Sequence, residues 1–270
     1  MAIEPGSTDF KLMMSGLERG LQVAHITTAA DQLRYCQHDE EIEAVLNRSD
    51  LLQFDQIPVQ EQGVIIGLVR KLTVPFGAKG PARRHMQLLG ESILVSADAS
   101  LLEYILNDSL DRLVIHGTKI HGLVTRSDLL KLPVTLLGFA LVTHVEAVML
   151  TLIRAIGVGE QIWLGYLEQG SRKDIRKRYK QLTEKRSDPD LLELTTFSNK
   201  HTILEHLAAE ETYASCLPDR ESISQLEEIR QLRNIIAHTG GKVDSPDSIQ
   251  ELIGLLRLTQ NWIERWQTEH

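Results

Sequence analysis

The sequence predicts an α+β half followed by an all-α half, and three observations support this division. Before about residue 132, short β-prone runs alternate with helical ones. After that point only helical periodicity is found. With 270 residues, 42% of them hydrophobic and 24% charged, the chain is long enough for two domains of about 130 residues each. We therefore expect an N-terminal segment over 1–17, an α+β domain over 18–132 and an all-α domain over 133–270.

The α+β half contains an internal repeat. Residues 56–74 read as strand, turn, strand, and residues 100–132 as helix, strand, turn, strand, helix. Residues 39–69 and 98–124 share one order: an acidic helix start, an amphipathic helix, a strand, a turn containing glycine, and a strand ending in Gly-Leu-Val. This self-similarity indicates a duplication.

The second half is predicted to be a bundle of helices. Glycine and proline punctuation divides it into helices at about 134–156, 159–184, 190–215, 220–238 and 248–267. Ser248, followed three residues later by Glu251, predicts a capping box for the last helix. The helix over 220–238 is expected to bury one stripe, formed by Leu226, Ile229, Leu232 and Ile236.

Several classes of protein are disfavoured by the composition. The most apolar stretch, residues 132–158, contains His144, Glu146 and Arg154, which are costly in hydrocarbon, so it predicts a buried core helix and not a membrane span. The two cysteines, Cys36 and Cys216, lack the spacing of metal ligands, and no secretion signal is evident. We therefore expect a cytoplasmic protein with no membrane association and no metal.

The charge distribution allows two interpretations. A net charge of −8 argues against a general nucleic-acid coat. Residues 171–186, however, hold eight basic and two acidic side chains. They form either the solvated face of a helix that buries Ile175, Tyr179 and Leu182, or a weak RNA-binding surface. The RNA-binding candidates are Arg172, Lys173, Arg176, Lys177, Arg178 and Lys180.

A candidate ligand site lies at the end of the second repeat, in the sequence GLVTRSDLL over 122–130. A strand ending at Val124 and a helix opening at Thr125 present free backbone N–H groups where an anion is favoured. The candidate ligand-binding residues are Thr125, Arg126, Ser127 and Asp128. An alternative needs no ligand: Thr125 caps the helix, and Asp128 at its third position complements the helix dipole.

Residues 18–132 resemble the CBS domain family through the repeat and the Gly122, Thr125, Asp128 signature. The resemblance implies tandem units with an adenosine nucleotide (AMP, ADP, ATP or a related ligand) in a cleft between them, and an aspartate that accepts both ribose hydroxyls. The first copy reads GLVRKLTVP over 67–75, with neither threonine nor aspartate where expected. At most one cleft is therefore expected to be a standard site.

A second candidate site lies at the end of the helix over 220–238. Asn234 and His238 are four residues apart and share a face, whereas Arg233 projects about 140° away from His238. Two copies of the helix across a dimer axis could bring arginine and histidine together. The alternative is a helix end, where the dipole favours His238 and a glycine pair stops the helix.

Arg233, Asn234 and His238 resemble the Arg-polar-x-x-x-His motif of the HEPN superfamily. The resemblance covers about residues 133–268 and implies an all-α homodimer that cleaves RNA without metal, as in toxin–antitoxin or stress-response systems with an antitoxin or other partner protein. His238 would take the proton of an RNA 2′-hydroxyl, Arg233 would hold the phosphate, and Asn234 would orient the phosphate or the histidine. The expected products are a 2′,3′-cyclic phosphate and a 5′-hydroxyl.

Glu146 and Arg154, eight residues apart near one face of a helix, are either secondary members of that cleft or a salt-bridged seam between helices.

Three functions are compatible with the sequence. The favoured one is a nucleotide-regulated, metal-independent endoribonuclease. The others are a non-catalytic sensor of adenylates that dimerises or holds a partner, and an RNA-binding regulator that does not cleave RNA.

Overall fold

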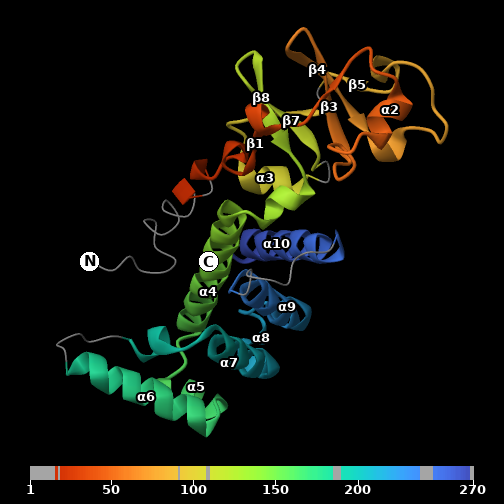
Figure 1. The fold of residues 1–270 in the computed structure, drawn as a ribbon. Helices are drawn as coiled ribbons and strands as arrows, with labels where there is room; N and C mark the ends of the chain where they lie inside the picture. The colour runs from red at the N-terminus through yellow and green to blue at the C-terminus, as the bar shows by residue number, and fades with distance from the viewer. Residues whose placement is uncertain are drawn as a thin grey trace. The chain divides into compact units, whose positions relative to one another are not determined.

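The computed structural model describes residues 16–267 apart from 18, 91, 108–109, 185–189 and 238–245. The chain forms two compact units, one spanning Glu18–Val134 and the other including Thr135–His270 (Figure 1). Helix α4, Leu132–Ile156, begins in the first unit and continues into the second.

The first unit contains two four-stranded sheets. One sheet has the order β1-β8-β7-β6 and the other the order β2-β3-β4-β5. The strands are β1 Thr28–Ala29, β2 Cys36–Gln37, β3 Gln56–Glu61, β4 Val64–Arg70, β5 Gln87–Leu88, β6 Leu94–Ser96, β7 Arg112–His116 and β8 Lys119–Val124. The helices are α2 Ile42–Asn47 and α3 Leu101–Leu106, with 3₁₀ turns η1 Val23–Ile26, η2 Ala30–Gln32, η3 Lys71–Thr73, η4 Ala82–Arg84 and η5 Arg126–Leu130.

The internal repeat predicted from the sequence is present at the level of strand register. In both copies a short strand pairs in parallel with the first strand of an antiparallel hairpin. Each hairpin, β3–β4 and β7–β8, closes with a two-residue turn that contains a glycine at positive φ, as two-residue hairpin turns require. In each hairpin the register shifts directly after one valine of the first strand. That valine pairs with the glycine that begins the Gly-Leu-Val segment of the second strand. The two copies are therefore the same structural unit.

The two copies exchange their edge strands. Strand β1, which precedes the first copy, pairs with β8 of the second, and β5, which precedes the second copy, pairs with β4 of the first. A Cβ atom at Gly122 would lie 2.1 Å from the Thr28 carbonyl oxygen, and one at Gly67 would lie 2.5 Å from that of Gln87. Glycine at the start of each Gly-Leu-Val therefore allows the edge strand to approach.

The second unit is all-α, as predicted. Besides α4 it contains α5 Glu160–Tyr166, α6 Gln169–Thr183, η6 Leu191–Leu194, α7 Phe197–Ala209, α8 Glu211–Ala214, α9 Arg220–Ala237 and α10 Pro246–Gln267. Helix α9 packs against α7 and α10. The stripe predicted for α9 is buried throughout its length, at Leu226, Ile229, Leu232 and Ile236.

Two helices predicted as continuous are interrupted. The helix expected over 159–184 breaks at Leu167 and Glu168, which are both extended. Arg172 donates to the carbonyl oxygens of Gly165 and Leu167, so its guanidinium satisfies groups that the end of α5 leaves free. The segment expected as one helix over 190–215 is divided between η6, α7 and α8, and Thr196 caps α7 by accepting from the Asn199 N–H.

The capping box predicted at Ser248 is wrong. Helix α10 begins at Pro246, a residue that suits the first position of a helix because its missing N–H is not needed there. Ser248 therefore lies inside the first turn and not before it.

Helix α4 is long and apolar enough to cross a membrane by length and composition, and 72% of its most apolar window is buried. A Cβ atom at Gly138 would lie 2.5 Å from Ile236 Cδ1, so α4 packs closely on α9. The burial agrees with the core helix predicted from the sequence.

Candidate functional site

A pocket of about 150 Å³ lies between the two copies of the α+β unit. One of its walls is the segment that leads into and forms β3. Phe54, Gln56 and Pro58 line it, and their spacing of two residues places them on one face of an extended chain. This wall is mainly apolar, with one carboxamide between an aromatic ring and a proline.

The facing wall comes from the second copy. Leu123 near the end of β8, Thr125 after it, and Ser127 and Asp128 in η5 all line the pocket. Thr125 is the residue before η5, and the Asp128 carboxylate accepts from its backbone N–H at 2.6 Å. The sequence GLVTRSD therefore forms the strand end and helix start that were predicted.

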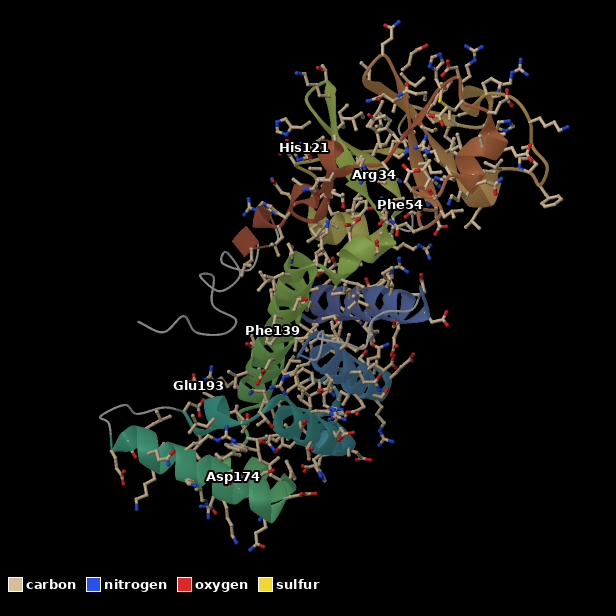
Figure 2. All side chains as sticks on the ribbon, in the orientation of Figure 1. Arg34, Phe54, His121, Phe139, Asp174 and Glu193 are labelled. Atoms are coloured by element: carbon tan, nitrogen blue, oxygen red, sulfur yellow. The ribbon has the colours of Figure 1, made fainter. Side chains whose placement is uncertain are left out.

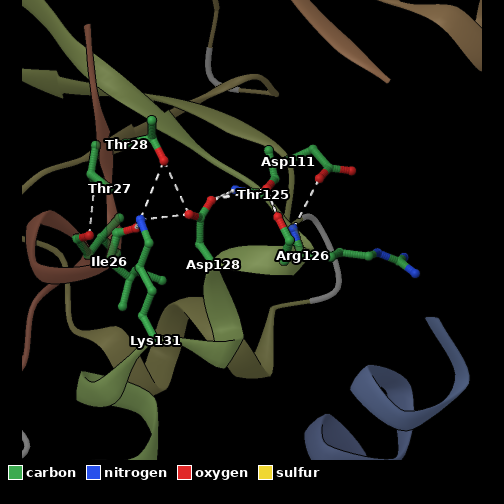
Figure 3. A network of polar contacts seen from close by, with 10 residues as sticks. Ile26, Thr27, Thr28, Asp111, Thr125, Arg126, Asp128 and Lys131 are labelled. Atoms are coloured by element: carbon green, nitrogen blue, oxygen red, sulfur yellow. Dashed lines mark hydrogen bonds and ion pairs between the residues drawn. The ribbon is translucent and has the colours of Figure 1, made fainter. Parts of the chain in front are cut away.

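The Asp128 carboxylate is the centre of a polar network (Figure 3). It is 6% exposed. Its Oδ1 atom accepts from Thr28 Oγ1 at 3.2 Å and lies 2.7 Å from Lys131 Nζ. Its Oδ2 atom accepts from both the N–H and the hydroxyl of Thr125. Four contacts match the roughly four lone-pair positions of a carboxylate, so any ligand that binds Asp128 must replace one of them.

The remaining lining comes from β1, from the end of η2 and from the chain that follows it. Thr28, Gln32, Leu33 and Arg34 belong to this segment. Arg34 and Phe54, both labelled in Figure 2, are exposed. Among the described residues that line the pocket, Arg34 is the one cation.

Sequence reasoning missed Thr28, Arg34, Phe54 and Gln56. They lie in segments without a motif, and they meet residues 123–128 only because the two copies fold against each other and exchange edge strands. Phe54 and Pro58 carry a weak signal, since both flank the start of a strand in the repeat.

Arg126, a sequence candidate, is not among the residues that line the pocket. Its backbone N–H donates to Asp111 Oδ1 at 3.3 Å, and its side chain extends away from Asp128 (Figure 3). The other three candidates, Thr125, Ser127 and Asp128, line the same pocket.

The equivalent position in the first copy is chemically different. Aligning GLVRKLT with GLVTRSD places Arg70 where the second copy has Thr125. The Arg70 guanidinium donates to the Asp111 carbonyl oxygen at 2.9 Å, across the boundary between the copies. A long side chain therefore bonds to protein where the second copy presents a short hydroxyl.

The candidate catalytic residues of α9 are only partly described. Arg233 and Asn234 are exposed on the helix, away from its buried stripe. His238 lies outside the described residues. Arg230, one turn before Asn234, is paired with Glu227.

The basic residues of α6 divide into two groups. Arg172 bonds to the end of α5, and Arg178 donates to the Leu194 carbonyl oxygen at 3.0 Å. Lys173, Arg176, Lys177 and Lys180 are exposed, and at 100° per residue they fall on one stripe. Ile175 is buried while Tyr179 and Leu182 are half-buried on the opposite side, so α6 is amphipathic as expected.

Glu146 and Arg154 take part in ion pairs with other elements. Lys200 of α7, itself buried, lies 2.9 Å from Glu146, and Arg154 lies 2.8 Å from Asp190 and 2.6 Å from Glu193. This arrangement is the salt-bridged seam that the sequence allowed. Among the described residues, no cluster of three or more His, Cys, Asp or Glu side chains could hold a metal ion.

No model of a known protein family matches the sequence, and no curated protein matches it. Solved structures similar to this chain are CBS domains. They include that of a bacterial CNNM/CorC family Mg²⁺ transporter in complex with ATP, at 15% identity and a TM-score of 0.35, covering 44% of this chain and 92% of that one. The CBS domains of a transcriptional regulator from Streptococcus pneumoniae share 16% identity at a TM-score of 0.33, covering 40% of this chain and 95% of that one.

A third similar structure is CBSX2 in complex with AMP, at 17% identity and a TM-score of 0.35, covering 43% of this chain and 98% of that one. Such low identities and TM-scores assign no role to any residue of this chain.

Proposed function

We propose that the α+β unit is a tandem CBS module that binds an adenosine nucleotide and thereby regulates the helical unit. One observation carries the proposal: a single pocket combines an apolar wall with an aromatic ring, a buried carboxylate already bonded to hydroxyl groups, and one cation. Those three features suit a base, a ribose and a phosphate respectively.

The carboxylate suits a ribose because it already binds hydroxyls. Thr28 and Thr125 each place an O–H on Asp128, and a ribose diol would offer two groups of the same kind. Exchange of one hydroxyl for another conserves the number of hydrogen bonds, so it costs little enthalpy. The second ribose hydroxyl would take the place of the Lys131 ammonium and weaken its ion pair with Asp128.

The size of the pocket limits what it can enclose. A volume of about 150 Å³ is below the roughly 300–1,000 Å³ of sites that enclose a drug-sized ligand. The nucleoside therefore occupies the pocket and the phosphates extend from it, where the exposed Arg34 guanidinium can pair with them.

Thermal unfolding tests the nucleotide site. AMP, ADP or ATP should raise the melting temperature of the wild-type protein, because a ligand of the folded state stabilises it by mass action. Asp128→Ala should abolish the shift, whereas Asp98→Ala, an exposed acid in the same unit, should keep it. An unchanged shift in Asp128→Ala would move the site elsewhere.

Regulation is proposed to pass through Lys131. This residue joins η5, which carries Asp128, to the start of α4 at Leu132. Its ammonium contacts Asp128, the Ile26 carbonyl oxygen and Thr28. A ribose that takes up the carboxylate changes the contacts of a residue directly before a helix that continues into the helical unit.

The helical unit is proposed to be a HEPN-type homodimer that cleaves RNA in the cytoplasm without metal. The exposure of Arg233 and Asn234 beside a fully buried α9 stripe supports this proposal, because both polar groups are available to a ligand. The exposed basic stripe of α6, formed by Lys173, Arg176, Lys177 and Lys180, favours an RNA partner.

RNA cleavage is tested with RNA, EDTA and adenosine nucleotides. Wild-type protein should produce 2′,3′-cyclic phosphate and 5′-hydroxyl ends, and His238→Ala should not. Salt-dependent RNA binding without cleavage would instead select the RNA-binding regulator. Absence of both binding and cleavage, with intact nucleotide binding, would select the non-catalytic sensor or a protein partner such as an antitoxin.

A further inference from the structure

One side chain that lines the pocket has a buried acceptor without a hydrogen-bond partner in the described part of the chain. Gln56 lines the pocket, and its Oε1 atom is shielded from solvent without a hydrogen-bond partner among the described residues. A buried carbonyl oxygen without a donor is costly, because it has lost its bond to water and gained nothing. Such an atom in a ligand pocket is a candidate for a bond that the ligand supplies.

Gln56 is positioned to contact the base of a bound nucleotide rather than its sugar. It lies between Phe54 and Pro58 on the apolar wall, whereas Asp128 lies on the facing wall. A planar base packs on an aromatic and apolar surface, and its polar edge then reaches the carboxamide on that same wall. Glutamine is also the side chain whose amide matches the edge of adenine, by accepting from the N6 amino group and donating to a ring nitrogen.

We infer that Gln56 is the residue that selects adenine, by accepting a hydrogen bond from its exocyclic amino group. The inference rests on the proposed nucleotide site. It adds to the proposed site a residue outside the GLVTRSD motif. It also gives a reason why the site would distinguish adenine from other purines, because a base without an amino donor leaves Oε1 of Gln56 unpaired.

A bond within the protein is the competing explanation. Arg70 is the ladder partner of Gln56, and its Nε atom is likewise buried without a partner among the described residues. The Arg70 guanidinium is directed instead to the Asp111 carbonyl oxygen. If Gln56 were placed to bond Arg70, its replacement would reduce stability without altering the choice of base.

The test varies the base and the side chain together. AMP and purine riboside 5′-monophosphate, which lacks only the amino group, are titrated by calorimetry into the wild-type protein and into Gln56→Met. Methionine keeps the length of the side chain and removes the acceptor. The wild-type protein should prefer AMP by about tenfold, and the variant should bind both ligands equally because its affinity for AMP falls.

Gln53→Met is the matched control, since Gln53 lies three residues before Gln56, is exposed and is not among the residues that line the pocket. It should keep the tenfold preference. The melting temperature of each variant without ligand shows that it is folded. A preference that persists in Gln56→Met overturns the inference while leaving Asp128-dependent binding of AMP, and so the proposed function, intact. Failure of the wild-type protein to bind either ligand overturns both.

Discussion

At the scale of single residues, Asp128 is at once a structural cap and the proposed ribose acceptor. Its carboxylate holds the Thr125 N–H that begins η5 and meets hydroxyls from both ends of the α+β unit. The two interpretations that the sequence left open, a helix cap and a ligand site, are therefore physically compatible. Binding has only to exchange a hydroxyl or the Lys131 ammonium on a carboxylate that is already in place.

Arg34 is expected to distinguish nucleotides from nucleosides. Arg34→Ala should reduce the preference for AMP over adenosine by roughly tenfold, because a charge-assisted hydrogen bond to phosphate is lost. Titration of both ligands into both proteins at low salt measures this ratio. Arg126→Ala is the control, since the Arg126 side chain extends away from Asp128. A loss of preference in that control would assign the phosphate to Arg126 instead.

Cys36 is expected to make the stability of the fold depend on pH in the alkaline range. Burial raises the pKa of its thiol from 9.0 to about 11, and the nearby Glu40 carboxylate adds to the shift. A raised pKa means that the folded state disfavours the thiolate, so this contribution to stability is intact below pH 9 and is lost as the pH rises towards 11.

Urea unfolding at pH 7.5 and pH 10 tests this expectation. The difference in unfolding free energy between wild type and Cys36→Ala should shrink by about 1 kcal/mol at the higher pH. Other groups that titrate in this range are common to both proteins and cancel in the difference. A difference that is constant with pH would contradict the assignment to Cys36.

At the scale of elements, the edge-strand exchange makes one glycine critical. A Cβ atom at Gly122 would meet the Thr28 carbonyl oxygen at 2.1 Å and Thr27 Cγ2 at 2.5 Å. Gly122→Ala should therefore displace β1, destabilise the protein by about 1–3 kcal/mol and weaken AMP binding through Thr28.

Gly254→Ala provides the contrast, measured by the same urea unfolding. Gly254 lies within α10, and nothing lies within 4 Å of the added Cβ, so alanine should raise stability by about 0.5–1 kcal/mol. Equal effects of the two substitutions would show that close approach of β1 is not what requires glycine at 122.

Lys131 lies at the junction of η5 and α4 and is expected to compete with the ligand. Lys131→Met removes the ammonium from Asp128, so AMP should bind several-fold more tightly. The effect of AMP on RNA cleavage should be lost in this variant. Calorimetry and a cleavage assay measure the two quantities separately. Weaker AMP binding in the variant would mean that the ammonium contacts the ligand, and would contradict the proposed route of regulation.

At the scale of the whole molecule, the proposed RNA site requires two chains. A regular helix that ran from Arg233 to His238 would place their side chains about 140° apart, so one phosphate would be reached by both groups only when two helices face each other. Arg233→Ala and His238→Ala should each reduce RNA cleavage by about 10²-fold or more. Mixing the two inactive proteins should restore part of the activity if the chains form a homodimer that shares its sites.

Sedimentation checks the assembly directly. A monomer at micromolar concentration, or mixed mutants that remain inactive while the wild-type protein cleaves RNA, would contradict a shared site. Because Arg233 is exposed and off the buried stripe, Arg233→Ala should change stability by no more than about 1 kcal/mol, so lost activity would not reflect unfolding.

The sequence by itself determined the division into an α+β half and an all-α half, the repeat, the turns and the strand-to-helix junction at Thr125. These features depend on local periodicity, glycine placement and capping, which act between residues close in the chain. The sequence did not predict the helix breaks at Leu167 and Thr196. Arg172 and the Thr196 cap stabilise these breaks through contacts that hydrophobic periodicity does not report.

Only the tertiary structure decided which residues complete the pocket. Thr28 and Asp128 are 100 positions apart, and Phe54 and Gln56 face them from the other copy. Their meeting depends on the packing of two repeats and the exchange of edge strands, and no local pattern encodes the distance between such segments. The burial of the Gln56 oxygen without a partner among the described residues is likewise a property of the packed molecule, because any glutamine is satisfied by water until folding removes the water.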